Sequence, residues 1–450
     1  MRSAIPSLLL IVSAHALGAG AVTRFIPHEL PKLDLPGNIF TSPQAINDAG
    51  MVTGESGSSQ VTIGMHAFSW SLGQPMLDLD EGSWPATAGL KINQAGTIAG
   101  DATFCPQQDG ACASQPIVFL LDGTIVELEP VYTGYLVVTG INNNDQVIFN
   151  RVQTPGSSNI SPRYWSPMDG TTILPLPGTA FSGYALDLND SGQAVGYSVG
   201  GGYTAHIWTD GTISSLQVEP GGDAKAQAIN NMGVIVGEAD FDGTRHAVRW
   251  LNAQAAPEQL VTDPAAVRST ATTIEGDGTI LGTWTDSDNR NLPFRIAPEG
   301  TVDLLTPPDH PGGTLELVPV GGTPGGWLVC LHMSSFYELQ TAVWVPGEGW
   351  IFVNDRLVGP GSHTSQAPVD CNANGQIITR GAVWTTPTFL DPMPPGDVDG
   401  DKVVGINDIL AVLAGYGQCP PHPSRLCEAD VTADDQVDID DILGVIDNWD

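Results

Sequence analysis

The chain has 450 residues, of which 41% are hydrophobic and 15% charged, so it can bury a sizeable core and form two domains. Fifty acidic residues against 16 basic ones give a formal net charge of −34. This balance excludes the basic surface of a nucleic-acid-binding protein and disfavours binding to anionic membranes.

Residues 1–21 have the pattern of a secretory signal peptide. Arg2 supplies the positive start, Leu8 to Val12 the apolar centre, and Ala19-Gly20-Ala21 a small-residue cleavage pattern. The apolar run is too short to span a membrane. We therefore expect a secreted protein that is extracellular or at the cell surface, with a mature chain from Val22.

Export permits disulfides, and six cysteines admit fifteen pairings. Nearness in the sequence favours Cys105 with Cys112 and Cys419 with Cys427. Cys330 and Cys371 then remain as the third pair. Metal binding by these cysteines is the weaker interpretation, because the chain has no CxxC pair.

One phrase recurs from Ala45 onward, for example AINDAGMVTGE at Ala45 and LDLNDSGQAVGY at Leu186. Its asparagine returns about every 46 residues between Asn47 and Asn372. A second phrase such as HAFSW follows each copy, and then an Asp-Gly turn with a third apolar stretch. Asp-Gly between alternating apolar runs is a strong hairpin signal. Each repeat is therefore expected to hold three or four short strands and no helix.

A period of 40–50 residues built only of strands is typical of β-propeller blades. Eight copies of the phrase predict eight blades, with seven as the alternative because the copy near Val318 is degenerate. Residues Val22–Pro36 are similar to the third stretch and are expected to complete the last blade, which closes the ring. We assign residues 22–386 to this propeller and the Pro-rich residues 387–395 to a linker.

The phrase HAF at His66 and the AINxxGxxxG pattern at Ala45 resemble the HAF-type extracellular repeat of secreted bacterial proteins. The resemblance covers about residues 40–385. It implies the propeller fold and an extracellular bacterial location, but no activity, because propellers host many functions.

Residues 396–450 contain two copies of a carboxylate-rich loop. Calcium takes six to eight oxygen ligands, and such loops supply them from positions 1, 3, 5, 7 and 12. The predicted ligands of two structural Ca²⁺ ions are Asp397, Asp399, Asp401, the Val403 carbonyl and Asp408, then Asp430, Thr432, Asp434, the Gln436 carbonyl and Asp441. Because the carboxylates would otherwise repel one another, we expect calcium binding to be coupled to folding of this segment.

Apolar residues at helical spacing follow each loop. A duplicated loop-then-helix unit with Asp at position 12 resembles the type I dockerin, over residues 396–449. That resemblance implies docking to a cohesin-like partner through loop positions 10 and 11. Ile406-Asn407 and Ile439-Asp440 stand there, in place of the usual Ser-Thr. Attachment to another cell-surface protein is the alternative.

Two further patterns have structural interpretations. GYSVG, residues 196–200, matches the G-x-S-x-G nucleophile pattern but lacks the helix that should follow. His66, His206 and His246 are expected to occupy the same place in different blades, which indicates a shared structural role rather than a triad.

No catalytic motif stands out, so whether the chain is an enzyme stays open. We expect a secreted binding or scaffolding protein: the propeller recognises a carbohydrate or protein ligand, and the calcium module attaches the protein to a scaffold or the cell surface. The alternative is an extracellular polysaccharide-degrading hydrolase or lyase, with Trp84, Trp284 and Trp350 as candidates for stacking on sugar rings. A surface-structural protein is the third possibility. We expect no nucleic-acid partner and no transmembrane segment.

Overall fold

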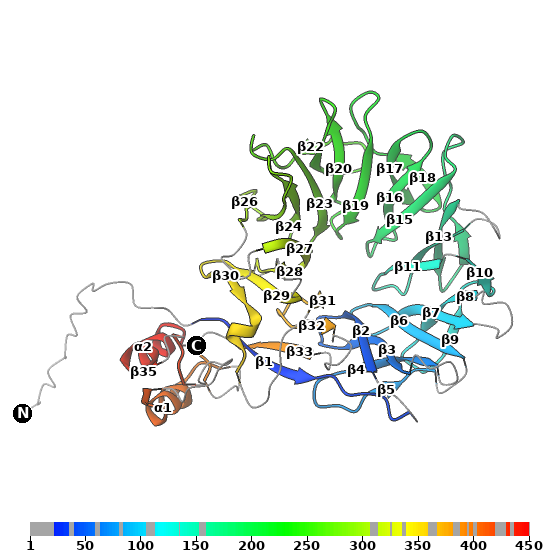
Figure 1. The fold of residues 1–450 in the computed structure, drawn as a ribbon. Coiled ribbons are helices and arrows are strands. Elements are labelled where there is room, and N and C mark those ends of the chain that lie inside the picture. Colours follow the sequence, from blue (N-terminus) through cyan, green and yellow to red (C-terminus); the bar gives the residue numbers. More distant parts are fainter. Residues whose placement is uncertain are drawn as a thin grey trace, which may run out of the picture. The chain divides into compact units, whose positions relative to one another are not determined.

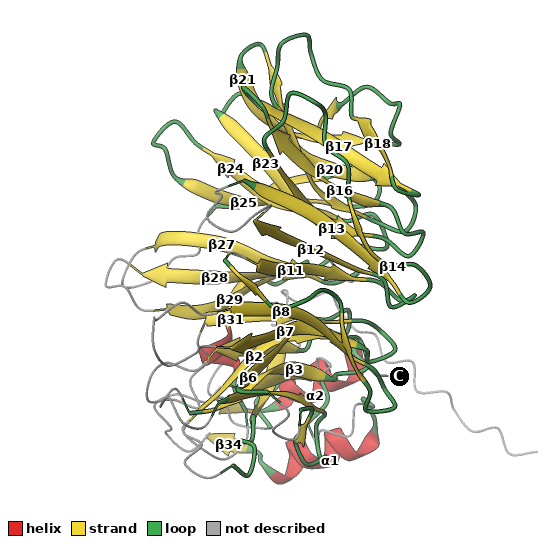
Figure 2. Cartoon of the chain, turned by 90° about the vertical axis from the view of Figure 1, so that its right-hand side faces the viewer, coloured by secondary structure: helices red, strands yellow, loops and turns green. Residues whose placement is uncertain are grey.

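The computed structural model describes residues 22–35, 40–58, 64–80, 84–104, 113–134, 136–152, 159–306, 314–324, 326–334, 339–358, 367–380, 388–393, 396–398, 403–418, 429–432 and 436–449. The predicted signal peptide lies outside these residues. Strands dominate the described part, and its α-helices are α1 (Ile406–Ala414) and α2 (Ile439–Asp447) (Figure 2).

Eight antiparallel sheets form an eight-bladed β-propeller (Figure 1). Blade 1 consists of β2 (Phe40–Ile46), β3 (Val52–Gly57), β4 (Met65–Trp70) and β5 (Leu77–Asp78), and blade 2 of β6 (Ala86–Ile92), β7 (Ile98–Phe104), β8 (Ala113–Phe119), β9 (Ile125–Glu127) and β10 (Tyr132–Thr133). Blade 3 consists of β11 (Leu136–Ile141), β12 (Val147–Val152), β13 (Ile160–Ser166) and β14 (Gly170–Ile173), and blade 4 of β15 (Ser182–Leu188), β16 (Ala194–Val199), β17 (Tyr203–Thr209) and β18 (Thr212–Ser215). Blade 5 consists of β19 (Ala224–Ile229), β20 (Ile235–Phe241), β21 (Thr244–Trp250) and β22 (Glu258–Gln259), and blade 6 of β23 (Arg268–Ile274), β24 (Ile280–Thr285), β25 (Asn291–Ile296) and β26 (Val302–Leu304). Blade 7 consists of β27 (Thr314–Gly322), β28 (Leu328–Ser334), β29 (Leu339–Val345) and β30 (Gly349–Phe352), and blade 8 of β31 (Ala367–Cys371), β32 (Ile377–Arg380), β33 (Thr388–Met393) and β1 (Arg24–Glu29). The prediction of eight blades is confirmed, and the degenerate copy near Val318 builds a complete blade.

The repeated phrase builds the turn between the first two strands of a blade. The Asn47 N–H donates to the Met51 carbonyl, and the Gly50 N–H donates back to the Asn47 carbonyl. Gly50 has φ 74°, a conformation that glycine adopts without strain. The same pair of backbone bonds recurs in turns that begin at Asn93, Asn142, Asn189, Asn230, Glu275, Thr323 and Asn372. A β-bulge in the first strand precedes each turn, such as the one between Pro43 and Ala45 in β2.

Neighbouring blades bury their apolar faces against each other. Ile148 and Leu174 of blade 3, for example, share one core cluster with Ala185, Leu188 and Trp208 of blade 4. A single blade could not bury both of its faces, so stacking the blades supplies the hydrophobic stabilisation.

The last blade is completed by the N-terminal strand. Its order is β1-β33-β32-β31, which confirms that the stretch after Val22 closes the ring. The predicted linker is corrected in part, because Thr388–Met393 form the strand β33. Residues 381–385, which carry the second phrase (GAVWT) in this blade and were expected to form a strand, lie outside the described part.

A second compact unit comprises the described parts of Met1–Ile26, Asp355–Pro360 and Pro392–Asp450. It contains α1, α2, part of the 3₁₀ helix η1 (Val353–Arg356) and the short strands β34 (Gly417–Gln418) and β35 (Gln436–Val437). Its core is a cluster of valines and an alanine: Val398, Val404, Val412, Ala429, Val431, Val437 and Val445. Among the described residues, neither helix has the length and hydropathy that crossing a membrane requires.

Candidate functional site

The predicted calcium ligands lie at the beginnings of the two helices and in the loops before them. At the two loop starts Asp397 and Asp430 are fully buried, and at position 12 Asp408 and Asp441 are equally inaccessible. Thr432 is also buried. Val403 and Gln436, whose carbonyls were predicted at position 7, have exposed side chains. The predicted ligands outside the described residues are Asp399, Asp401 and Asp434.

Position 12 connects each loop to its helix. In the first copy, Asp408 Oδ1 accepts the Val398 N–H at 2.6 Å and Oδ2 accepts the Gly405 N–H at 2.7 Å. Gly405 is the N-cap of α1, so the same carboxylate that faces the loop start also begins the helix.

The second copy repeats this arrangement. Asp441 Oδ1 accepts the Thr432 N–H at 2.9 Å, and Oδ2 accepts the N–H of the α2 N-cap, Asp438, at 2.7 Å. Each loop thus folds back on its position-12 carboxylate and buries two acidic side chains. Buried carboxylates are costly without a compensating charge, and oxygen ligands in such a loop suit Ca²⁺.

The two helices carry matching apolar stripes on their exposed faces. Each stripe begins at loop position 10, and the residues at i, i+4 and i+7 are Ile406, Leu410 and Leu413 on α1, and Ile439, Leu443 and Ile446 on α2; each is at least 48% exposed. The core of this unit is filled instead by other helix residues, Val412 and Val445.

In the propeller, the repeated asparagines join neighbouring blades. Asn47 Nδ2 donates to the Asn93 carbonyl at 3.0 Å, and Asn372 Nδ2 donates to the Asn47 carbonyl at 2.9 Å, across the closure of the ring. The intervening bonds run from Asn93 to Asn142, from Asn142 to Asn189 and from Asn189 to Asn230. We call this series the asparagine ring.

The asparagine ring is interrupted at blades 6 and 7, where Glu275 and Thr323 take the place of asparagine. Within the described part of the chain, Asn230 Nδ2 is buried and has no hydrogen-bond partner. Burial, and then the neighbouring charges of Asp277, Asp370 and Asp48, raise the pKa of Glu275 to about 7.

Further carboxylates gather on the innermost strands. Asp187 Oδ2 accepts the Ile229 N–H at 2.8 Å, and Asp370 Oδ2 accepts the Ile46 N–H at 3.1 Å, so each joins its blade to the next. Burial raises the pKa of both, that of Asp370 to about 6, while the positive charge of Lys91 opposes the rise. We define Asp187, Glu275, Asp370 and Lys91 as the inner acidic cluster. None of these four was singled out from the sequence as a site residue.

Ser198 of the GYSVG pattern lies 2.8 Å from His206 Nε2, within the reach that a nucleophile and its base require. Ser215 Oγ, and not a carboxylate, lies near the other ring nitrogen, at 3.2 Å. His206 has no exposed surface, and burial lowers its pKa to about 4. No helix follows the turn, so the expected structural role of Ser198 fits this geometry better than catalysis does.

The strand register corrects the equivalence expected for the three histidines. His66 and His246 each lie two residues before the residue that pairs with a repeated glycine, Gly54 in blade 1 or Gly237 in blade 5. His206 itself pairs with the corresponding glycine of blade 4. His66 and His246 are therefore equivalent, and His206 is not.

The predicted pair Cys330 and Cys371 is also corrected, because both are free thiols. Burial raises the pKa of each thiol well above its usual range. The other four cysteines lie outside the described residues.

The tryptophans proposed for sugar stacking have structural contacts. Trp284 is buried and its Nε1 donates to the Pro293 carbonyl, and Trp350 Nε1 donates to the Thr306 carbonyl. Trp84 is partly buried against the core of blades 1 and 2.

No family model matches the chain, and no curated protein matches it. Among solved structures, a prolyl endopeptidase is similar over 79% of this chain and 54% of its own length, with 12% identity and a TM-score of 0.51. A post-proline cleaving enzyme from Rickettsia typhi matches over 71% and 54%, with 12% identity and a TM-score of 0.48. The propeller domain of the Trilobed protease from Pyrococcus furiosus matches over 71% and 97%, with 9% identity and a TM-score of 0.43.

These comparisons correct the expected function. The chain spans about half the length of the prolyl endopeptidase, and at this identity the likeness concerns the fold. The protein that it resembles in fold is a prolyl endopeptidase, so the binding scaffold and its alternative, the polysaccharide-degrading enzyme, are both set aside.

Proposed function

We propose that this chain acts on peptides, and that its propeller is the part that engages the peptide substrate. The observation that carries the proposal is the fold, which a prolyl endopeptidase shares over 79% of this chain. Because the chain matches only about half of that enzyme, the proposal concerns the propeller's part in peptide processing. Proline-containing peptides are the substrate class to test first.

The inner acidic cluster offers a place for a charged group of the peptide. It brings Asp187 and Asp370 within electrostatic reach of one lysine, Lys91, and Glu275 within reach of Asp370. Three carboxylates against one ammonium group attract a cation, and a peptide carries one at its free amino terminus. Binding of that amine would also relieve the mutual repulsion of the carboxylates.

The test measures hydrolysis and binding of fluorogenic proline peptides by the full chain. The peptides are used in two forms, with free and with acetylated amino termini. We expect Asp370→Asn to raise KM for the free peptides and to leave acetylated peptides unaffected. Asp242→Asn, in an exposed turn of blade 5, is the matched control. Binding without hydrolysis would assign the chain a peptide-binding role alone, and neither binding nor hydrolysis would refute the proposal.

We also infer that residues 396–450 form a dockerin-like module that folds around two Ca²⁺ ions. The burial of Asp397, Asp408, Asp430 and Asp441 supports this inference, as does the matching geometry of the two position-12 carboxylates. Calcium would supply the positive charge that these loops lack, and the protein would supply the oxygen ligands.

The membership of the propeller in the HAF-type repeat family, export of the chain to the bacterial exterior and a cohesin-like or cell-surface partner for residues 396–450 remain predictions. The two apolar stripes on α1 and α2 are the surface to test for such a partner. Substitution of Leu410 and Leu443 by lysine would abolish its binding and leave calcium affinity unchanged.

A further inference from the structure

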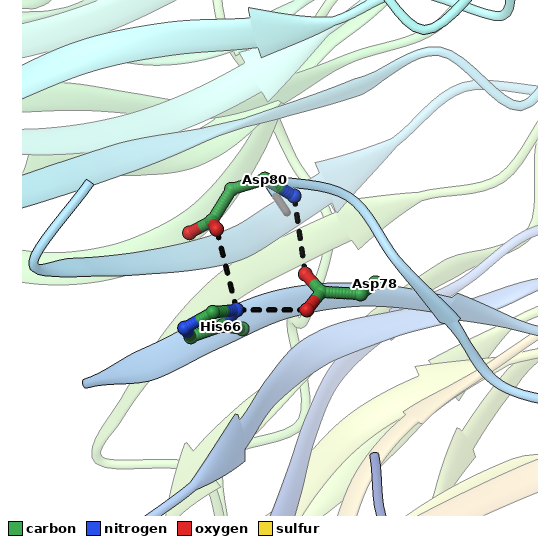
Figure 3. A group of neighbouring side chains, drawn as sticks. All are labelled: His66, Asp78 and Asp80. Atoms are coloured by element: carbon green, nitrogen blue, oxygen red, sulfur yellow. Dashed lines mark hydrogen bonds and ion pairs between the residues drawn. The ribbon is translucent and has the colours of Figure 1, made fainter. Parts of the chain in front are cut away.

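Three side chains of blade 1 form a compact group at its outer strands (Figure 3). His66 comes from β4, Asp78 from β5, and Asp80 lies just beyond β5. His66 Nδ1 is 2.8 Å from Asp78 Oδ2 and 3.2 Å from Asp80 Oδ1. The Asp80 side chain is fully buried, and that of Asp78 is 23% exposed.

Each carboxylate uses one oxygen elsewhere and directs the other toward the imidazole. Asp78 Oδ1 accepts the Asp80 N–H at 3.2 Å, and Asp80 Oδ2 accepts the Thr87 hydroxyl at 2.5 Å. Thr87 belongs to β6 of the next blade, and its Oγ1 accepts the Ala67 N–H at 2.8 Å. Such outer hydrogen bonds fix the orientation of metal ligands in proteins.

The distances and the charges fit a divalent cation. Zinc binds nitrogen and oxygen ligands at about 2.0–2.2 Å, so neighbouring ligand atoms lie about 3.0–3.5 Å apart. The separations of 2.8 and 3.2 Å are close to that range. Two carboxylates and a neutral imidazole carry a charge of −2, which a divalent cation cancels, whereas protonating His66 would cancel only half of it.

The propeller contains its own comparison site. His246 occupies the place of His66 in blade 5, where Gln259 stands in the place of Asp78 and Val261 in that of Asp80. The fold therefore accepts this histidine without either carboxylate. Blade 2 has Glu127 and Glu129 at the places of Asp78 and Asp80, but Gln115 at the place of His66. Blade 1 thus combines the histidine of blade 5 with the two acids of blade 2, and packing of the histidine does not explain those acids.

We propose that His66, Asp78 and Asp80 bind a zinc-class divalent transition-metal ion in blade 1, with Thr87 of blade 2 hydrogen-bonded to the ligand Asp80. Imidazole with carboxylates suits Zn²⁺ better than Ca²⁺, which prefers oxygen ligands alone. Three protein ligands leave a fourth position for water.

The test is a Zn²⁺ titration of the full chain by calorimetry, after metal removal and in excess Ca²⁺ so that the oxygen-only loops are occupied. We expect one Zn²⁺ equivalent. His66→Gln should weaken its binding by about 100-fold or more, and Thr87→Val by about 10-fold. His246→Gln is the matched control and should bind as the unaltered chain does.

Circular dichroism reports whether each variant folds. If His66→Gln does not fold, Asp78→Asn, at the partly exposed position, takes its place in the titration. Zn²⁺ should also raise the melting temperature of the unaltered chain but not that of a folded variant. The proposal is overturned if the unaltered chain binds no Zn²⁺ in excess Ca²⁺, or if a folded His66→Gln or Asp78→Asn variant keeps the full affinity.

Discussion

Single residues decide where the propeller is strongly joined and where it is weak. The asparagine ring uses one side chain both to close a turn and to reach the next blade: Asn93 Oδ1 accepts the Gly96 and Thr97 N–H groups while Nδ2 donates to the Asn142 carbonyl. Glu275 has no amide group to donate. Its place in the series was visible in the sequence, but its surroundings were not, because they come from blades distant along the chain.

Replacing Glu275 by Asn should stabilise the protein at neutral pH, because it removes a buried group that must ionise there. Burial holds the pKa of Glu275 at about 7, above its ordinary 4.5, so the native state retains a proton that the unfolded chain releases. The stability contributed by this proton is present below pH 4.5 and is lost as the pH rises to 7. The advantage of Glu275→Asn should therefore grow across that range, to about 3 kcal/mol.

Urea unfolding of both proteins between pH 4 and pH 8 measures this difference. Glu299→Gln, at an exposed turn of the same blade, is the control and should give no pH-dependent gain. An advantage of Glu275→Asn that stays constant over the whole range would contradict the assigned pKa.

A substitution at Ser198 tests whether the match to the G-x-S-x-G pattern marks a catalytic serine. We expect Ser198→Ala to leave any peptide hydrolysis unchanged, because the serine and its histidine are both buried. The substitution removes a hydrogen-bond partner from buried His206, so stability should fall by about 1–3 kcal/mol. Loss of hydrolysis in a variant that still folds would instead identify a nucleophile.

At the scale of elements, each predicted calcium loop and its helix form one unit. Asp441 closes its loop and belongs to the capping box of α2, so loop and helix should form together. The sequence predicted both helices and both position-12 residues, because the loop spacing and the helical apolar pattern are local signals. It could not predict which apolar residues face outward, since that depends on how α1 and α2 pack.

Chelation of calcium should therefore unfold α1 and α2 and leave the propeller folded. Circular dichroism at 222 nm should lose its helical signal on addition of EDTA, while the thermal transition of the propeller stays in place. Asp441→Asn should weaken calcium binding about tenfold or more, because it removes one charge from the loop. Asp447→Asn, on the exposed side of α2, should not. A helical signal that is indifferent to EDTA would refute the module.

At the scale of the whole molecule, repetition made the propeller predictable. The repeat period and the Asp-Gly turns predicted eight blades and closure by the N-terminal stretch. Each of these signals can be recognised within a short stretch of the chain. Thr388–Met393 was missed as a strand because its Pro392 and the prolines after it resemble a linker, although proline is tolerated near the end of a strand. The inner acidic cluster was missed because only ring closure brings blades 2, 4, 6 and 8 together.

Because β1 closes the ring, the stability of the propeller should depend on this strand, which is far in sequence from the other strands of its blade. A chain that begins at Leu30 lacks β1 and its fully buried Phe25, whose removal alone costs about 3–5 kcal/mol. It also exposes the edge of β33, which can then pair with a second molecule. Compared with a chain that begins at Val22, we expect a lower melting temperature in calorimetry and concentration-dependent association in size-exclusion chromatography. If the two chains melt together and both remain monomeric, the ring closes without β1.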